Sequence, residues 1–139
     1  MNKILLLLSC LFIVSPAIAQ DIFSGRWNML YYNSNNNIQD YFDITLTQDS
    51  TKLTGSHDGV FFRGNRIESR DNSIKGEIKN GVAIITIKSG RTATKAGTAK
   101  IEYIGKDSVL FTLIKEPSDG EHMIPKNIIL TRDKSYKQK

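Results

Sequence analysis

The side chains best suited to acid–base or metal chemistry are the two histidines, His57 and His122, and a set of carboxylates on or beside apolar runs. Those carboxylates are Asp40, Asp43, Glu68, Glu77 and Glu102. Catalysis needs a nucleophile or paired acids close to a base and an orienting group, and nothing in the spacing groups these residues. His57 adjoins Asp58 at an expected tight turn, so we expect both imidazoles to be exposed to solvent. A zinc site would need more ligands at defined spacing.

Sequence motifs of the common catalytic sites are absent. The chain contains no Gly-x-Ser-x-Gly, His-Glu-x-x-His or phosphate-loop pattern. Its only cysteine, Cys10, lies in an N-terminal apolar run that we expect to be removed, which excludes thiol catalysis and cysteine-ligated metal in the mature chain. We therefore predict a protein that is not an enzyme and that carries no cofactor and no metal.

The N-terminus has the pattern of an export signal. Lys3 precedes an apolar run over 4–14, and Ala17-Ile18-Ala19 provides a cleavage site before Gln20. The run is too short for the roughly 20 residues that cross a bilayer as a helix, so we expect no membrane span. A lipoprotein cut before Cys10 is the weaker alternative, because it leaves almost no signal. We expect residues 1–19 to be removed and the protein to be periplasmic or secreted.

The formal net charge of +5 is a mild excess, and part of it lies in residues 133–139, which we expect to form a flexible charged tail. No basic stripe or base-stacking motif accompanies this charge, so we expect no nucleic-acid partner.

Alternation of apolar and polar residues runs through the chain, and no stretch has a convincing helical period. The expected strands are 27–32, 41–47, 51–57, 60–62, 73–79, 82–88, 98–104, 109–115 and 127–132. Asp58-Gly59 and Asn80-Gly81 predict two-residue hairpin turns. Eight or nine strands in sequential hairpins predict an all-β domain over 20–132, a single up-and-down antiparallel β-barrel of about eight strands. A β-sandwich of the same strands is the alternative.

Three residues at the two ends of this domain support a resemblance. Gly25 and Trp27 open the first expected strand, and Arg132 ends the last one. This pattern resembles the calycin barrels, which include the lipocalins and avidins. The resemblance implies that Arg132 lies across the indole of Trp27 and closes one end of the barrel. The segment 53–56 is similar to one in avidins, but Trp27 is the only tryptophan, whereas several tryptophans wall the biotin pockets of avidins.

Two sets of residues are candidate contact surfaces. The first has the aromatic and arginine composition of a binding surface and consists of Tyr31, Tyr32, Tyr41, Phe61, Phe62 and Arg63. The alternative is that these aromatics belong to the core. The second set arises because the late strands are apolar on both faces, and the pattern does not decide which face points inward. If the outward face is the one with Ile85, Ile87, Leu110 and Ile114, these side chains form an exposed apolar row. Such a row marks a protein-contact or homodimer face unless loops or chain ends cover it.

We therefore expect an exported binding protein, and two mechanisms stay open. Either the molecule blocks or docks onto a protein partner, like an inhibitor or immunity protein, or it carries a small apolar or amphipathic ligand inside the barrel, like a lipocalin. Large residues expected to point inward, namely Phe42, Ile44, Ile84 and Phe111, favour a filled barrel and a protein partner.

Overall fold

The computed structural model describes residues 20–90, 94–117 and 121–137. The expected signal peptide therefore lies outside the described residues, as do residues 91–93 and the last two residues of the expected tail. The strands are β1 (Gly25–Tyr32), β2 (Ile38–Asp49), β3 (Lys52–Phe61), β4 (Arg66–Lys79), β5 (Val82–Ile87), β6 (Gly97–Gly105), β7 (Ser108–Lys115) and β8 (Asn127–Arg132).

Each strand pairs with the next in an antiparallel sense, and β8 returns to β1 to close the barrel. This confirms the predicted all-β, up-and-down antiparallel barrel of eight strands. Within the described part of the chain, no helix is long and apolar enough to cross a membrane.

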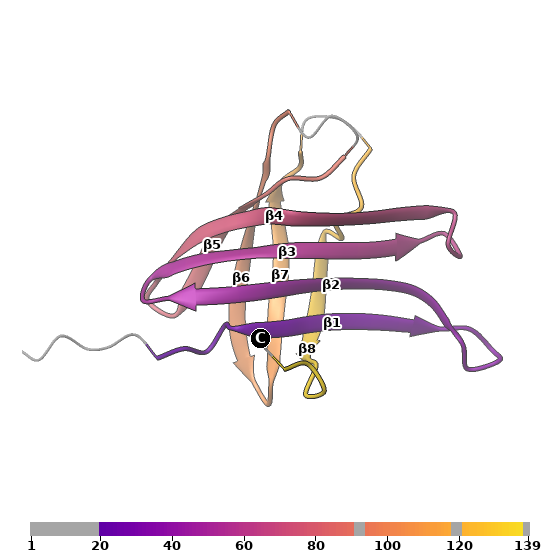
Figure 1. The fold of residues 1–139 in the computed structure, drawn as a ribbon, viewed down its shortest axis with the longest axis horizontal. Helices are drawn as coiled ribbons and strands as arrows, with labels where there is room; N and C mark the ends of the chain where they lie inside the picture. The colour runs from indigo at the N-terminus through magenta and orange to yellow at the C-terminus, as the bar shows by residue number, and fades with distance from the viewer. Residues whose placement is uncertain (1–19, 91–93, 118–120, 138–139) are drawn as a thin grey trace, which may run out of the picture.

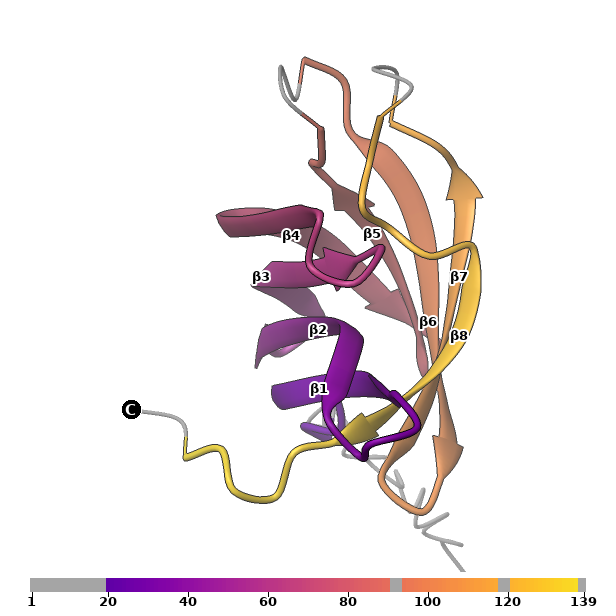
Figure 2. The same cartoon turned by 90° about the vertical axis from the view of Figure 1, so that its right-hand side faces the viewer.

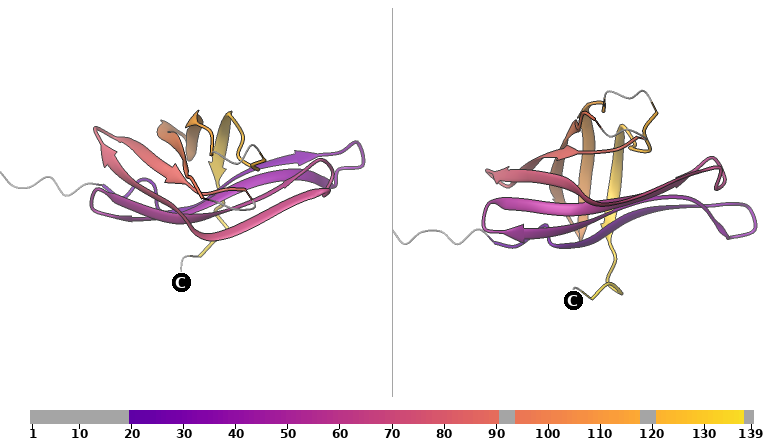
Figure 3. Two further views of the ribbon diagram at one scale, coloured as in Figure 1. Left: turned by 90° about the horizontal axis from the view of Figure 1, so that it is seen from above. Right: turned by 45° about the horizontal axis from the view of Figure 1, so that its top comes forward.

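The barrel consists of two parts that cross one another. Strands β1–β4 lie side by side as one curved layer, and β5–β8 run across it (Figures 1 and 2). The β1–β2 and β3–β4 hairpins project beyond the crossing strands, on the right in Figure 1 and again in both views of Figure 3. Strands β2 and β4 are 12 and 14 residues long, whereas β5 and β8 have only 6, so the longer strands extend past the shared core.

The first and last strands pair with each other over only two residues each. Trp27 pairs with Arg132 and Asn28 with Thr131, and the Asp133 N–H donates to the Arg26 carbonyl at 2.8 Å. The tail is therefore held to β1 at its first residue. Beyond Asn28, β1 runs clear of β8 (Figure 1).

The inward side chains of all eight strands, together with Phe23 and Ile124, form one continuous hydrophobic core. Its largest members are Trp27, Phe23, Phe42 and Phe111, all fully buried, and the Phe42 and Phe111 rings meet edge to face with centroids 5.6 Å apart. Large side chains therefore point into the barrel interior.

The prediction of which β5 side chains point inward was wrong. Ile84 is 44% exposed, whereas Ile85 and Ile87 are buried in the core. Register gives the physical reason, because Ile85 lies between Gly76 on β4 and Ala99 on β6. These small neighbours leave room for an isoleucine inside, and a Cβ on Gly76 would lie 2.7 Å from Ile85 Cγ2.

One of the two predicted hairpin turns is confirmed. Asn80 and Gly81 both have positive φ, at 52° and 76°, as a primed turn requires. The turn predicted at Asp58-Gly59 is wrong, because both residues lie within β3 and pair with β2 on one side and β4 on the other. The chain reverses instead after Phe61, where φ is 56° at Phe62 and 58° at Arg63.

Candidate functional site

Arg132 and Trp27 make the contact that the calycin resemblance implies. The guanidinium carbon lies 4.0 Å from the centroid of the indole. Arg132 also donates to the carbonyls of Ile22, at 2.8 Å, and Ser24, while Trp27 Nε1 donates to the Phe23 carbonyl at 2.8 Å. The pair thus fastens the segment before β1 across one end of the barrel.

Gly25 leaves the space that this arrangement needs. Its φ is +127°, and a Cβ there would lie 2.8 Å from Arg132 Nη1. All three residues that carry the resemblance therefore meet in one structural cluster at the closed end of the barrel.

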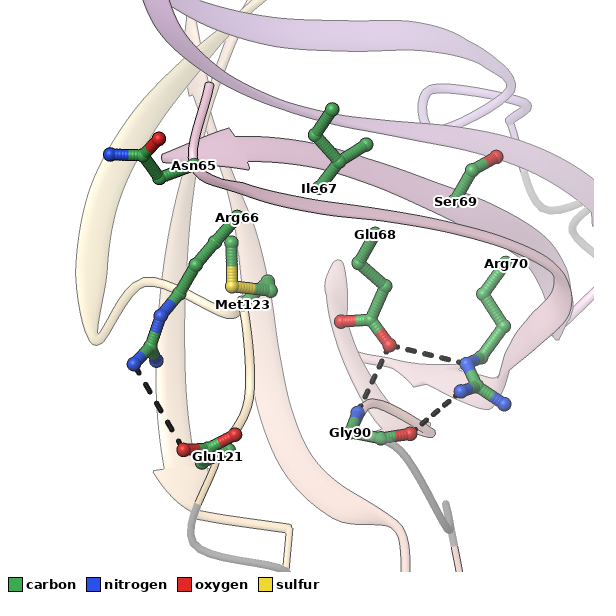
Figure 4. Close-up of a pocket in the computed structure, with 9 residues that line it drawn as sticks. All are labelled: Asn65, Arg66, Ile67, Glu68, Ser69, Arg70, Gly90, Glu121 and Met123. Carbon is green, nitrogen blue, oxygen red and sulfur yellow. Dashed lines mark hydrogen bonds and ion pairs between the residues drawn. The ribbon is translucent and has the colours of Figure 1, made fainter. Parts of the chain in front are cut away.

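The opposite end has an open cleft of about 580 Å³ between β4 and two loops (Figure 4). The side chains of Arg66, Glu68 and Arg70 point from β4 towards these loops, while Ile67 and Ser69 point away from them. The cleft is also lined by Asn65, Gly90, Glu121 and Met123. Its walls are therefore largely polar, and none of them belongs to the hydrophobic core.

Glu68 is the centre of a polar cluster under this cleft. Its Oε1 accepts hydrogen bonds from Gly90 N, at 3.0 Å, and from Arg70 Nε, at 3.2 Å. Its Oε2 accepts from the Ser89 hydroxyl and lies 3.4 Å from His57 Nε2. Both carboxylate oxygens are therefore engaged by the protein itself.

The environment keeps Glu68 ionised. Burial on its own would raise the pKa of this carboxyl, but the nearby His57 imidazole and the hydrogen bonds from Ser89 and the Gly90 N–H outweigh burial and lower the pKa from 4.5 to about 2. Because the Ser89 hydroxyl also accepts a hydrogen bond from Met123 N at 3.2 Å, the cluster ties both loops of the cleft to β4.

The expectation of two exposed histidines was wrong. His57 is fully buried, and its Nδ1 lies 2.7 Å from Ser73 Oγ. Since β3 continues past His57 without turning, strand alternation directs the ring into the barrel. The side chain of His122 is 12% exposed and lies 3.8 Å from Glu116.

Ser73, His57 and Glu68 have the residue types of a hydrolytic triad and lie in sequence around the His57 ring, with Ser73 Oγ at Nδ1 and Glu68 Oε2 near Nε2. The hydroxyls of Ser73 and Ser89 belong to buried residues, and His57 has no exposed surface. The cluster is best described as a polar plug that fixes the loops.

The structure does not bring the predicted aromatic set together on one face. Tyr41 lies on the outer face of the β1–β4 layer, while alternation places Tyr31 and Phe61 on the opposite face, and Tyr32 follows a register shift at the end of β1. Phe61 packs against the core. Phe62 and Arg63 lie in the turn after β3, so this set is dispersed around the projecting hairpins.

The expected outward row on the late strands does not exist as predicted. Ile85 and Ile87 point into the core, Leu110 is half-buried, and Ile114 is 59% exposed. The error follows from the inverted faces of β5, and β6 also lies between β5 and β7, so the four residues are not on neighbouring strands.

A surface that we did not predict lies on the outer face of β1–β4. Leu30, Tyr41, Val60 and Ile67 occupy successive strands in one register. Sequence reasoning missed it because Ile67 lies in the polar segment 63–72, which lacks an alternating pattern. The sequence contains one local indication of this surface. In an alternating strand, Leu30 lies on the face opposite to Trp27, and Tyr41 lies on the face opposite to Phe42.

Beside this apolar row, Asp43 faces Asp58 across β2 and β3. Asp43 is only 2% exposed and its Oδ2 lies 2.6 Å from Arg26 Nη2. Burial raises the pKa of Asp43, the pairing with Arg26 opposes that rise, and the neighbouring Asp58 carboxylate adds to it. Asp43 Oδ1 has no hydrogen-bond donor among the described residues.

No protein-family model matches this chain, and neither the curated proteins nor the solved structures contain a match to it. The closed eight-stranded barrel is compatible with a calycin-like fold. Among the residues that the structure describes, no group of three or more histidine, cysteine or acidic side chains is placed to hold a metal ion.

Proposed function

We propose that this protein is exported to the periplasm as a calycin-like, non-enzymatic binding protein that docks onto or blocks a protein partner. The observation that carries the proposal is the filled barrel. Trp27, Phe42 and Phe111 are fully buried in one continuous core, which leaves the outside of the molecule as the place for binding.

The projecting hairpins supply side chains suited to a protein interface. Tyr31, Tyr32 and Phe62 are each more than half exposed, and the Arg66 guanidinium carbon lies 5.3 Å from the centroid of the Phe62 ring. Exposed tyrosine, phenylalanine and arginine side chains are typical of interface residues that contribute most to binding energy.

A second candidate function is the binding of a small amphipathic ligand at the mouth rather than in the interior. The observation in its favour is the cleft of about 580 Å³, a size within the usual range for small-molecule sites. Its polar walls favour a ligand with charged or hydrogen-bonding groups over an apolar one.

The test is native mass spectrometry of the mature protein purified from its own periplasm after mild cross-linking. We expect a complex with a second protein that is lost in a Tyr31→Ser/Tyr32→Ser/Phe62→Ser variant. Tyr103→Ser is the matched control, because Tyr103 is also exposed but lies on β6 in the other part of the barrel. A one-to-one complex with a small molecule, and no protein complex, would contradict the proposal and establish ligand carriage.

A further inference from the structure

The cleft at the mouth of the barrel runs along an edge of β4 that is open on one side. Strand β3 pairs with β4 from Arg66 onward, whereas within the described residues β5 pairs with it only from Ile74 onward. Every residue of 65–70 lines the cleft, although the side chains of Ile67 and Ser69 point away from it (Figure 4). These two residues therefore meet the cleft through their main chain.

The register of the sheet gives the direction of these main-chain groups. In an antiparallel sheet, successive residues direct their N–H and C=O alternately to the two sides of the strand. The Arg26 carbonyl of β1 accepts from Asp133 N, so Arg26 and Asn28 face away from β2. Following the paired residues from Asn28 across β2 and β3 shows that Ser69 faces away from β3, as does Ile67. Two pairs of N–H and C=O groups therefore point from β4 towards the open edge.

An extended peptide is the ligand whose chemistry matches this edge. Ile67 and Ser69 are two residues apart, so their main-chain groups repeat at about 6.8 Å, which is the repeat of the hydrogen-bonding groups of a strand. A strand laid along the edge would pair with both residues, and main-chain pairing of this kind is a recurring mode of peptide recognition. The lining formed by 65–70 is about 17 Å long, enough for a segment of about six residues.

Arg66 gives the cleft a preference for an acidic side chain. Its side chain is 49% exposed, and the carboxylate paired with it, Glu121, is 78% exposed and lies 4.0 Å away. An exposed pair of this kind contributes little, so an incoming carboxylate can replace it. Arg70 is already committed, because its Nε donates to Glu68 at 3.2 Å and its Nη2 donates to the Gly90 carbonyl at 2.7 Å. The positive charge available to a ligand is therefore that of Arg66.

We propose that this cleft binds an extended segment of a partner protein, which adds to the open edge of β4 as a strand and places an acidic side chain against Arg66. The hydrogen bonds of Ser89 and Gly90 to Glu68 hold one wall of the cleft in place against β4. The inference rests on the proposed docking function, and it names the site and the chemistry of the partner.

Amide hydrogen exchange followed by NMR tests the edge directly. The probes are peptides selected on the mature protein from a phage-displayed random dodecapeptide library and then synthesised. The amides of Ile67 and Ser69 should exchange about tenfold or more slowly in the peptide complex than in the free protein, because they then donate to the added strand. The Glu68 amide is the internal control, since it faces β3 in both states and its exchange should not change.

Two substitutions test the main chain and the charge separately. Ser69→Pro removes one edge donor, and an edge strand tolerates proline where the nitrogen faces outward. This variant should bind the selected peptides about tenfold more weakly than Ser69→Ala, which keeps the N–H. Arg66→Gln should weaken binding about tenfold, and this loss should disappear when the acidic residue of the peptide is replaced by its amide. Lys79→Gln, an exposed cation at the far end of β4, is the matched control and should change affinity less than about twofold.

Four results would overturn the inference. They are the selection of no peptide, selected peptides without an acidic residue, unchanged exchange at Ile67 and Ser69, and equal affinity of Ser69→Pro and Ser69→Ala. Native mass spectrometry separates this failure from that of the proposed function. A partner complex that survives in Ser69→Pro and is lost in the triple serine variant leaves the docking function standing and excludes the cleft as its site. If only a small molecule is found, both fail.

Discussion

The guanidinium of Arg132, at the end of the last strand, stacks on the indole of Trp27 in the first, with 4.0 Å between the guanidinium carbon and the ring centroid. Because β1 and β8 share only two register pairs, this stacked contact is a large part of what joins the two ends of the chain. The same arginine donates to two carbonyls of the segment before β1. One side chain therefore closes the barrel and fixes its N-terminal segment.

We expect Trp27→Ala to lower the free energy of unfolding by about 3–5 kcal/mol, the usual cost of truncating a fully buried aromatic side chain. Urea denaturation followed by circular dichroism measures this change. Tyr103→Ala, on an exposed side chain, is the control and should cost far less. A loss below about 1 kcal/mol for Trp27→Ala would show that the indole is not part of the core.

Arg132→Lys should destabilise the protein although it keeps the positive charge. Lysine cannot stack a planar group on the Trp27 ring while donating to the Ile22 and Ser24 carbonyls. We expect a loss of about 1–2 kcal/mol, the sum of a weakened cation–π contact and a lost hydrogen bond. Lys134→Arg, on the exposed tail, is the control for the exchange of the two residue types. Equal stability of Arg132→Lys and the wild type would contradict the role assigned to the planar guanidinium.

Glu68→Gln should have an effect that depends on pH. The pKa of Glu68 is lowered on folding from 4.5 to about 2, so its charge stabilises the folded state above pH 4.5, and that stabilisation is lost as the pH falls towards 2. We expect the difference in unfolding free energy between wild type and Glu68→Gln to be largest near pH 6 and to shrink below pH 4.5.

Urea titrations at pH values from 6 to 3 test the Glu68 prediction, with Glu77→Gln as the control. Glu77 is a largely exposed carboxylate on the same strand, beyond the polar cluster. A difference for Glu68→Gln that stays constant with pH would mean that its charge plays no part in the stability of the cluster.

Gly76→Ala should destabilise the barrel through a steric clash. An added Cβ would lie 2.3 Å from the Ile84 carbonyl oxygen and 2.7 Å from Ile85 Cγ2, and backbone cannot move aside cheaply. We expect a loss of about 1–3 kcal/mol or more, as in other overpacked cores. Lys75→Ala, at the neighbouring exposed position, is the control. Thermal unfolding measures both, and an unchanged melting temperature for Gly76→Ala would contradict the close approach of β4 and β5.

Local patterns were sufficient for most of the architecture. Alternation over 41–47 and the Asn80-Gly81 turn are properties of short segments, and both are confirmed. The prediction of strands and turns failed where the local sequence pattern disagrees with the pairing imposed by neighbouring strands. Segment 66–72 lacks alternation but is held as strand by β3, and Asp58-Gly59 has the composition of a turn but is paired on both sides. Pairing with neighbouring strands overrides turn propensity there.

The sequence by itself determined that this chain forms sequential antiparallel strands, because period-two alternation and turn residues act over a few neighbours. Only the tertiary structure decided which face of β5 is inside, since Ile84 and Ile85 are equally apolar and the choice depends on the small residue Gly76 opposite. It also brought His57, Glu68 and Ser89 together, and set Asp43 against Asp58. Those contacts depend on register between strands, which no single segment encodes.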